Sequence, residues 1–427
     1  CHRVTHDTQT NKRNFTRHIM IIDIIRSNFK IIIFGFVFTF FSCIGQSFFI
    51  GLFNSEIRNE LNISHAEFGS IYGIATLCSS LSLIWLGKKI DEIKLVNYSF
   101  LVIFLLFLAS IFFSFVNGII FLFIGIFLLR LAGQGLMSHT ATTTISRYFE
   151  RTRGKALSFT WLGMSLGEFI LPVLIVFLLS FMHWRDLWIQ IGILVLIFLP
   201  IFSYFTVKDI KISSREKKRD YQKKLLLIKS WTRKEVLKDF RFYSLLPSTL
   251  ACPFIITGIV INQSFIIESK GWDEYSIAKA FMFYSVLTVS TLFMSGFFVD
   301  KFTSRKILPY LNIPMLFGLI VLIIFDHSYS AFIFMGLLGI SNGLANVLVS
   351  SLWAEIYGVN FLGSIRALTG SLMVFSTALG TAIFGFLIDS GHSIESIGVI
   401  CSAYIMISLG IILIFWKSYV PITQKKT

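Results

Sequence analysis

Residues 96–116 read VNYSFLVIFLLFLASIFFSFV and contain no Asp, Glu, Lys or Arg. A run of about 20 apolar residues is the length that an α-helix needs to cross the hydrocarbon core of a membrane. The rest of the chain has a similar character, because 55% of its 427 residues are hydrophobic and only 14% are charged. Soluble domains carry about 25% charged residues, and a soluble protein of this size could not bury so much apolar surface. The composition therefore indicates an integral membrane protein.

Eleven further apolar segments of similar length lie on either side of this run. Together they predict an all-α membrane protein with twelve transmembrane helices, and the lack of sustained alternation between polar and apolar residues argues against a β-barrel. Ser64 and Glu67 have the spacing of a capping box that would begin the second helix, and Asp273 is placed to cap the eighth. The expected spans are 29–53, 66–87, 96–116, 118–145, 154–181, 187–207, 241–268, 276–298, 306–325, 330–353, 362–388 and 395–417.

Positive charge is distributed unevenly between the two sides of this arrangement. The formal net charge is +15, and nearly all of the 38 Lys and Arg residues fall at the ends or in the loops that share a side with the N-terminus. By the positive-inside rule, both termini should lie in the cytoplasm, and we expect a multi-pass protein of the cell (inner or plasma) membrane. The basic charge is thus interpreted as a topology signal, and no nucleic-acid partner is expected. The exceptions are Arg58, Arg185, Lys270 and Lys279 on the opposite side and Arg130 within a span.

The longest polar segment inside the chain divides the twelve spans into six and six. We expect a cytoplasmic N-terminal segment (1–28), an N-terminal six-helix bundle (29–207), a basic cytoplasmic connector (208–240), and a C-terminal six-helix bundle with a short tail (241–427). Residues 1–19 precede the first methionine, Met20. They are interpreted as an extension before the start of the native protein at Met20 and not as part of the fold. Within the connector, Leu225, Leu226 and Ile228 could form a short amphipathic helix on the membrane surface.

The two predicted bundles repeat one another in sequence. Residues 45–50 read GQSFFI in the first span, and residues 262–267 read NQSFII in the seventh. The ends of the second and eighth spans also match, since GKKID at 87–91 corresponds to GFFVD at 296–300. Several such matches in the same order and at nearly the same spacing favour duplicated six-helix halves, which are typical of secondary transporters.

These repeated segments resemble a known family. A Gly-x-x-x-Asp sequence followed by basic residues, ending at Asp91 and again at Asp300 with Lys301 and Arg305 behind it, is similar to the loop motif of the major facilitator superfamily. Residues 130–135 (RLAGQG) and 148–156 (YFERTRGKA) are similar to the fourth and fifth helices of its monocarboxylate-transporter-like branch. The resemblance implies two pseudo-symmetric bundles, alternating access, and a central cavity lined by spans 1, 4, 7 and 10. It also implies that the acidic and basic loop residues latch the cytoplasmic gate; ordinary interfacial solvation is the alternative.

Two charged residues lie deep inside the predicted spans. Arg130 is about 18 Å from the outer end of its helix, and Glu168 is about 21 Å from the cytoplasmic end of the next helix, so their depths nearly agree. A charge in the bilayer is costly and should face the bundle interior with a partner. We expect Arg130 to attract an anionic substrate and Glu168 to be a protonation site. The alternative is a purely structural pair that joins the two helices.

Uncharged polar residues complete the predicted substrate site. Gln46 and Gln263 occupy matching positions of the repeat and can both donate and accept hydrogen bonds, so they could lie on opposite sides of a substrate. Interhelical hydrogen bonding is the alternative role. Weaker candidates are Asn342 and Asn346, together with Trp161, which shares the helix face of Glu168.

The sequence thus predicts a secondary transporter that works as a monomer in the lipid bilayer and moves a small anionic solute of the monocarboxylate type in symport with protons. Efflux of lipophilic compounds is an alternative, and a receptor or scaffold that does not transport is an alternative of another class. No cofactor or metal is expected, because the five cysteines are scattered and no nucleotide loop, metal-spaced His/Glu pair or serine elbow occurs. Enzyme activity is therefore not expected.

Overall fold

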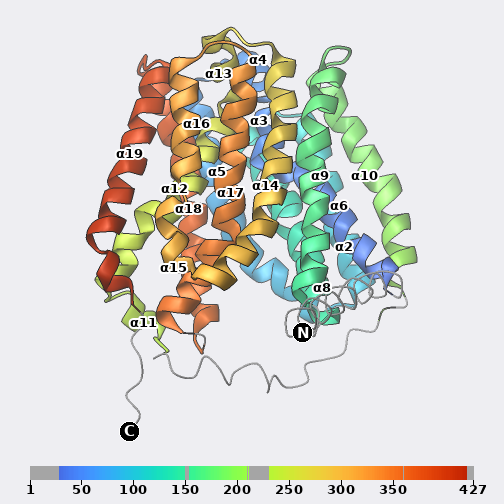
Figure 1. The fold of residues 1–427 in the computed structure, drawn as a ribbon. Coiled ribbons are helices and arrows are strands. Elements are labelled where there is room, and N and C mark those ends of the chain that lie inside the picture. The colour runs from blue at the N-terminus through green and yellow to red at the C-terminus, as the bar shows by residue number, and fades with distance from the viewer. Residues whose placement is uncertain (1–27, 150–152, 209, 211–229, 359, 421–427) are drawn as a thin grey trace, which may run out of the picture.

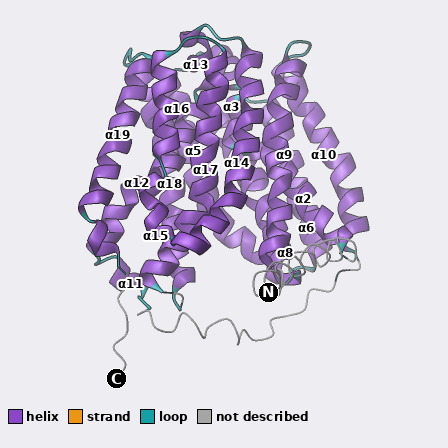
Figure 2. Ribbon diagram, in the orientation of Figure 1, coloured by secondary structure: helices purple, strands orange, loops and turns teal. Residues whose placement is uncertain are grey.

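A computed structural model of the chain describes residues 28–149, 153–208, 210, 230–358 and 360–420. Every regular element in this part of the chain is helical, and no strand occurs there (Figure 2). The predicted N-terminal segment and the amphipathic helix near Leu225 lie outside the described residues. Within the described ranges, twelve helices are long and apolar enough to cross a membrane, which confirms the predicted fold class and span number.

Two of the first six spans, the first and the fourth, depart from a continuous α-helix. Span 1 consists of α2, the 3₁₀ turn η1 and α3, and span 4 consists of α7, the π-helical segment η3 and α8. The elements of this half are α2 (Phe29–Ser42), η1 (Cys43–Gly45), α3 (Ser47–Gly51), α4 (Asn54–Leu61), α5 (His65–Lys88), η2 (Lys89–Asp91), α6 (Leu95–Ser114), α7 (Ile119–Leu129), η3 (Arg130–Met137), α8 (Ser138–Tyr148), α9 (Arg153–Leu179) and α10 (Trp184–Val207).

The second six spans follow the same plan. Span 7 ends at Asn262, where α13 begins in a new direction, and span 9 combines two short helices with α16. The elements of this half are α11 (Arg233–Val236), α12 (Phe240–Ile261), α13 (Gln263–Lys270), α14 (Glu274–Phe302), α15 (Ser304–Ile307), η4 (Leu308–Tyr310), α16 (Ile313–Ile324), α17 (Tyr329–Tyr357), α18 (Leu362–Asp389), α19 (Ile394–Ile414) and η5 (Trp416–Tyr419).

The helix starts agree in part with the predicted capping. Ser64 accepts a hydrogen bond from the backbone N–H of Glu67, and the Glu67 side chain accepts one from the backbone of Ser64, so the predicted capping box of α5 is present. Asp273 does occupy the N-cap position of α14, but its side chain makes no capping hydrogen bond. The predicted side-chain cap of the eighth span is therefore wrong.

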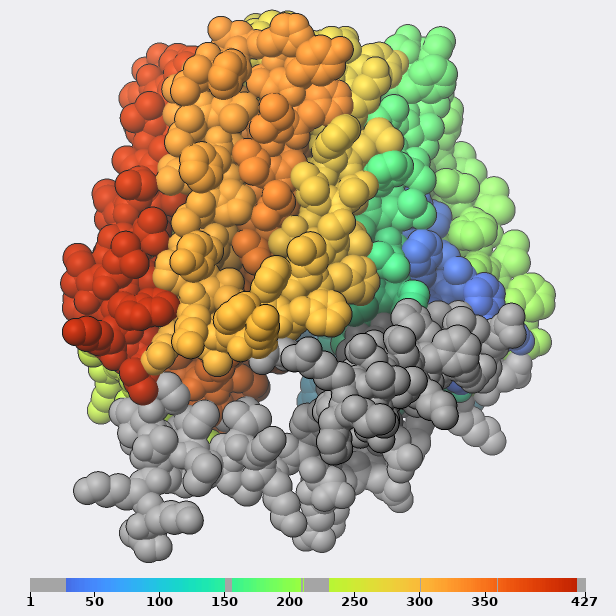
Figure 3. Space-filling view, in the orientation of Figure 1, coloured from blue at the N-terminus to red at the C-terminus, as the bar shows by residue number. Residues whose placement is uncertain are grey.

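The two halves stand side by side and contact each other mainly at one end. In Figure 1 this end, which contains α4 and α13, is at the top; we call it the α4 end, and the opposite end, which contains α8, α11 and α15, the α8 end. Among the described residues, three helix pairs bridge the halves: α5 with α18, α9 with α14, and α3 with α12. The space-filling view shows α14 packed directly on α9 toward the α4 end (Figure 3).

Hydrogen bonds between the halves are concentrated near the α4 end. The Asp389 carboxylate, at the end of α18, accepts hydrogen bonds from the backbone N–H groups of His65 (3.1 Å) and Ala66 (2.7 Å) at the start of α5. Asn54 Nδ2 donates to the carbonyl of Ile261 (2.8 Å). The halves are therefore joined at the α4 end, and their ribbons diverge toward the α8 end (Figure 1).

Glycines permit the closest of these contacts. A Cβ atom on Gly73 of α5 would lie 2.8 Å from the carbonyl oxygen of Ala378 of α18, and one on Gly69 or Gly385 would overlap backbone atoms of the opposite half. Thr381 Oγ1 donates to the Gly69 carbonyl across the same contact (3.0 Å). Small residues let transmembrane backbones approach closely, so these positions determine how tightly the α4 end closes.

Candidate functional site

Arg130 lies in the interior of the N-terminal half. It begins the π-helical segment η3, eleven residues from Ile119 at the α4 end, or about 16 Å along the helix. Its side chain is only 3% exposed. A π-helical turn is uncommon and occurs frequently at functional sites. The segment places a cation in the bundle interior, as the sequence predicted from the cost of exposing charge to lipid.

The Arg130 guanidinium is held by the neighbouring spans. Nη1 donates a hydrogen bond to the carbonyl of Gly45 (3.1 Å), and the guanidinium carbon lies 5.2 Å from the centre of the Tyr72 ring, within cation–π range. Nε is buried and has no hydrogen-bond partner among the described residues. The guanidinium thus has a fixed orientation, and Nε is among the donors that remain available.

Gly45 is a suitable acceptor because the first span is interrupted there. Gln46 has extended backbone angles (φ −83°, ψ 156°), so the helix stops after Gly45 and begins again at Ser47. The interruption and η3 are in direct backbone contact: a Cβ atom on Gly133 would lie 2.6 Å from the Gly45 nitrogen. An unwound span in a membrane must satisfy its backbone groups within the protein, and Arg130 satisfies one of them.

Glu168 lies at the same depth on the other side of the interrupted span. It is eleven residues from Leu179 at the α4 end of α9, again about 16 Å, and is 7% exposed. Gly167 packs against the Cys43 sulfur, and the Glu168 carboxyl is within electrostatic range of Cys43. Among the described residues, no ion pair or hydrogen bond reaches that carboxyl group.

The expected contact between Arg130 and Glu168 is therefore absent. Their depths agree as predicted, but η1 of the first span lies between them, with Gly45 on Arg130 and Cys43 beside Glu168. Depth along a helix gives no information about the direction around its axis, which explains the error. The two charged groups flank the interruption from opposite sides.

The two predicted glutamines occupy different environments. Gln46 Nε2 lies 4.0 Å from the Met164 sulfur, within the N-terminal half. Gln263 is 3% exposed, lies against Gly51 in the closed contact at the α4 end, and both of its amide atoms lack a partner among the described residues. In this conformation the two amides do not form the symmetric pair around a substrate that the repeat suggested.

The remaining candidates lie on α17 and α9. Asn342 Nδ2 donates to the hydroxyl of Tyr284 (2.8 Å), so it is already paired. Asn346, one turn further along α17, is exposed, and Trp161 is 40% exposed. Tyr284 is buried and within electrostatic range of Glu168. Sequence reasoning missed Tyr284, because a tyrosine among so many aromatic residues gives no distinct signal.

The predicted gate residues lie at the α8 end, where the halves are apart. Asp91 forms an ion pair with Arg147, so it joins spans 2 and 4 of the same half. Glu355 accepts hydrogen bonds from the backbone N–H groups of Ser304 (2.8 Å) and Arg305 (3.2 Å), which joins the start of α15 to α17. Lys301 is exposed and its ammonium lies over Phe302 (5.1 Å). The side chain of Asp300 lies outside the described residues.

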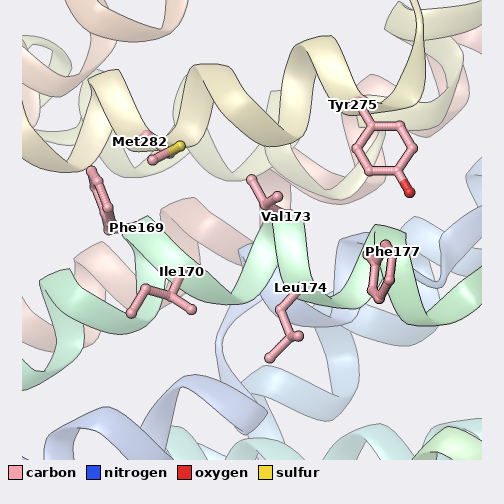
Figure 4. Close-up of a pocket in the computed structure, with 7 residues that line it drawn as sticks. All are labelled: Phe169, Ile170, Val173, Leu174, Phe177, Tyr275 and Met282. Atoms are coloured by element: carbon pink, nitrogen blue, oxygen red, sulfur yellow. The ribbon is translucent and has the colours of Figure 1, made fainter.

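An apolar pocket of about 380 Å³ lies away from Arg130, between α9 and α14 (Figure 4). Phe169, Val173 and Phe177 come from α9, and Tyr275 and Met282 come from α14 (Figure 4). Several of its lining side chains are largely exposed, as expected for a surface that faces lipid tails. Within the described ranges, no group of three or more His, Cys, Asp or Glu side chains could hold a metal ion.

Comparison with known proteins agrees with this architecture. The Major Facilitator Superfamily profile matches residues 35–381. An inward-facing, unoccupied structure of a bacterial homologue of the human lysosomal transporter Spinster covers 91% of this chain and 95% of its own, at 15% identity and a TM-score of 0.64. The nucleoside transporter NupG covers 91% and 99%, at 11% identity and a TM-score of 0.69.

No curated protein matches the sequence. At these identities the solved structures show a shared fold and leave the cargo open. The family match spans most of the chain and both halves of the bundle. The protein is therefore a multi-pass membrane transporter for a small molecule, not an enzyme, and it belongs to the major facilitator superfamily.

Proposed function

We propose that the protein moves a small organic anion of the monocarboxylate type together with protons, by alternating access. In this proposal Arg130 binds the carboxylate and Glu168 carries the proton. The observation that carries it is the buried Arg130 guanidinium, which is held by a backbone carbonyl rather than by an acidic side chain. An arginine without a carboxylate partner keeps its charge available for an anion and can bind a carboxylate through two parallel hydrogen bonds.

The position of Glu168 supports proton coupling. Its carboxyl group is buried, lies at the depth of Arg130, and has no cationic partner among the described residues. A buried and unpaired carboxyl group is favoured in its neutral form by desolvation. Binding a proton there would let the protein change conformation without moving an uncompensated negative charge through its interior.

The conformation of the two halves supports a specific step of the cycle. The basic loops favour a protein of the cell membrane with both termini on the cytoplasmic side. The α4 end then faces outward, so its closure corresponds to an inward-facing state. The gate residues Asp91, Lys301 and Arg305, together with Asp300, would then approach the opposite half in the outward-facing state. The proposed substrate path is lined by Gln46, Asn342, Asn346 and Trp161. Gln263 belongs to the contact that closes this path at the α4 end. We propose that the unit of transport is a monomer of two six-helix domains, 29–207 and 241–427, joined by the connector 208–240.

Thermal-shift measurements with small organic acids at pH 5.5 and 7.5 test this proposal. Lactate or pyruvate should raise the melting temperature of the wild-type protein and leave that of Arg130→Gln unchanged. Arg366→Gln is a matched control, because Arg366 is an exposed arginine that donates to Ser350 (2.8 Å) outside the proposed site. Equal responses of the wild type and Arg130→Gln would contradict the assignment of Arg130.

The apolar pocket between α9 and α14 favours a second candidate function, the efflux of lipophilic compounds. It lies at the contact between the halves (Figure 4), and Ile170, Leu174 and Phe177 of its lining are exposed at the outer surface of the bundle. A lipophilic cargo could enter there from the membrane. Val173→Trp would fill the pocket. If efflux is the function, this variant should export less of a lipophilic dye than the wild type. If efflux is not the function, the variant should bind organic acids as the wild type does.

A further inference from the structure

The contact between α9 and α14 places Glu168 of one half beside Tyr284 of the other. Ser285 Oγ donates a hydrogen bond to the carbonyl of Ser165 (2.6 Å), which fixes the two helices relative to one another. Ser165 and Glu168 are three residues apart on α9 and so share a face. Tyr284 precedes Ser285, is 5% exposed, and lies ten residues into α14, about 15 Å from the α4 end. The two residues therefore lie at nearly the same depth where α9 and α14 contact each other.

The Tyr284 hydroxyl has a defined hydrogen-bonding role. Asn342 Nδ2 donates to its oxygen (2.8 Å), so the hydroxyl hydrogen is left to donate to another group. Its backbone is held by α17, because a Cβ atom on Gly339 would overlap the Tyr284 carbonyl oxygen. Two groups with acceptor oxygens are near it: Thr288, whose own hydroxyl donates to the Gly339 carbonyl (3.1 Å), and the Glu168 carboxyl, which is within electrostatic range.

The surroundings of Glu168 offer few other groups that could respond to its charge. From the first span it faces Cys43, and from α14 it faces Tyr284, which is itself near Cys252 of α12. No lysine or arginine forms an ion pair with it in the described part of the chain. An ionised carboxylate buried here needs a hydrogen bond, because a buried unpaired charge is strongly disfavoured.

We propose that Tyr284 is the positioning residue that stabilises the ionised form of Glu168 when the α4 end is closed, with Asn342 holding the phenol in place. When Glu168 is neutral, the hydroxyl donates to Thr288; when Glu168 loses its proton, the hydroxyl donates to the carboxylate. The proton can then leave toward the α8 end without opening the contact between the halves. This inference rests on the proposed proton-carrying role of Glu168, and adds the residue of the opposite half that responds to it.

An infrared pH titration of the full-length protein in lipid vesicles tests this inference without requiring the substrate. The carboxyl C=O band that disappears in Glu168→Gln reports the protonation of Glu168. In Tyr284→Phe, the midpoint of that band should move to higher pH by about one unit, because a hydrogen bond to a charged group is lost. Asn342→Leu should move it in the same direction by a smaller amount, and provides a second test if Tyr284→Phe does not fold.

Tyr404→Phe is the matched control. Its hydroxyl donates to the carbonyl of Pro247 (2.7 Å) within the C-terminal half, so its loss should leave the midpoint unchanged. A wild-type midpoint in both Tyr284→Phe and Asn342→Leu would overturn the inference while leaving proton coupling through Glu168 intact. If Glu168→Gln removed no titrating band, the proposed role of Glu168 would itself be wrong, and the inference with it.

Discussion

The guanidinium of Arg130 donates a hydrogen bond to the carbonyl of Gly45 at the interruption of the first transmembrane span. The contact joins a π-helical segment of span 4 to an unwound turn of span 1, and both departures from α-helix meet at Gly45 and Gly133. Such junctions can rearrange, because neither backbone is committed to a continuous α-helical hydrogen-bond pattern there. We expect this junction to change when substrate binds.

The backbone contact at the junction leads to a first prediction. Gly133→Ala should destabilise the protein by about 1–3 kcal/mol, because the added methyl group would overlap the Gly45 backbone. The measurement is the thermal unfolding of purified protein in detergent. Gly410→Ala is the control, since nothing lies within 4 Å of a Cβ atom there, and its melting temperature should stay the same or rise. Equal melting temperatures for the two variants would count against a tight junction.

The Asp389 contact predicts how the α4 end responds to mutation. Asp389→Asn should weaken the two hydrogen bonds to the start of α5 and open this end about tenfold more often, since hydrogen bonds to a charged group contribute about 1.5–3 kcal/mol. A cysteine at Val260, which is 4% exposed in the closed contact, should then react faster with a water-soluble maleimide. Ser390→Ala should leave the maleimide rate unchanged, because the Ser390 hydroxyl donates only to the carbonyl of Phe386. If Asp389→Asn also left the rate unchanged, the Asp389 carboxylate would not hold the α4 end closed.

Two glutamates near the α4 end should affect stability with opposite pH dependence. Burial raises the pKa of the Glu56 carboxyl, and the nearby charge of Glu274 adds to the shift. A carboxyl whose pKa is raised by folding costs stability when it is ionised, above its ordinary pKa of 4.5. Glu56→Gln should therefore raise the melting temperature at pH 7, and this gain should shrink as the pH falls toward that value.

Glu60 provides the contrasting case. Burial opposes its charge, but hydrogen bonds from Arg185 (2.7 Å) and Trp184 (2.7 Å) outweigh this and lower the pKa of Glu60. Its contribution is present above the ordinary pKa and is lost as the pH falls through the lowered value. Glu60→Gln should lower stability at pH 7 by about 0.5–1 kcal/mol, because the pair is partly exposed. Changes of the same sign in both glutamate variants at pH 7 would refute this assignment.

Lys270 should stabilise the C-terminal half near the α4 end. Its side chain is fully buried between Asp326 (2.6 Å) and Glu395 (2.8 Å), which connects α13 to the loop after α16 and to the start of α19. Lys270→Met should cost about 1–3 kcal/mol, less than for a fully buried pair, because both carboxylates are partly solvated. Thermal unfolding should show no such loss for Lys279→Met, where the lysine is exposed. Equal losses for both would mean that the ion pairs contribute little.

The sequence predicted the spans well, because a membrane helix depends mainly on the length of an apolar run. The interruption at Gln46 and the π-helical segment after Leu129 were not predictable, since both depend on how two spans pack. The same limit explains Glu168: its depth followed from its position in the chain, whereas its separation from Arg130 depends on helix rotation and on the span between them. Tyr284 becomes visible as a candidate only when α14 is placed against α9.

Uptake of labelled lactate and pyruvate by vesicles that contain the purified protein, under an imposed proton gradient, tests the central claim most directly. We predict that the wild type accumulates at least one of the two, and that a protonophore abolishes this accumulation. Glu168→Gln should exchange that substrate without accumulating it, Arg130→Gln should do neither, and Arg366→Gln should match the wild type. Accumulation that is independent of the gradient, or Arg130→Gln that transports like the wild type, would contradict a carboxylate carrier built around these two residues.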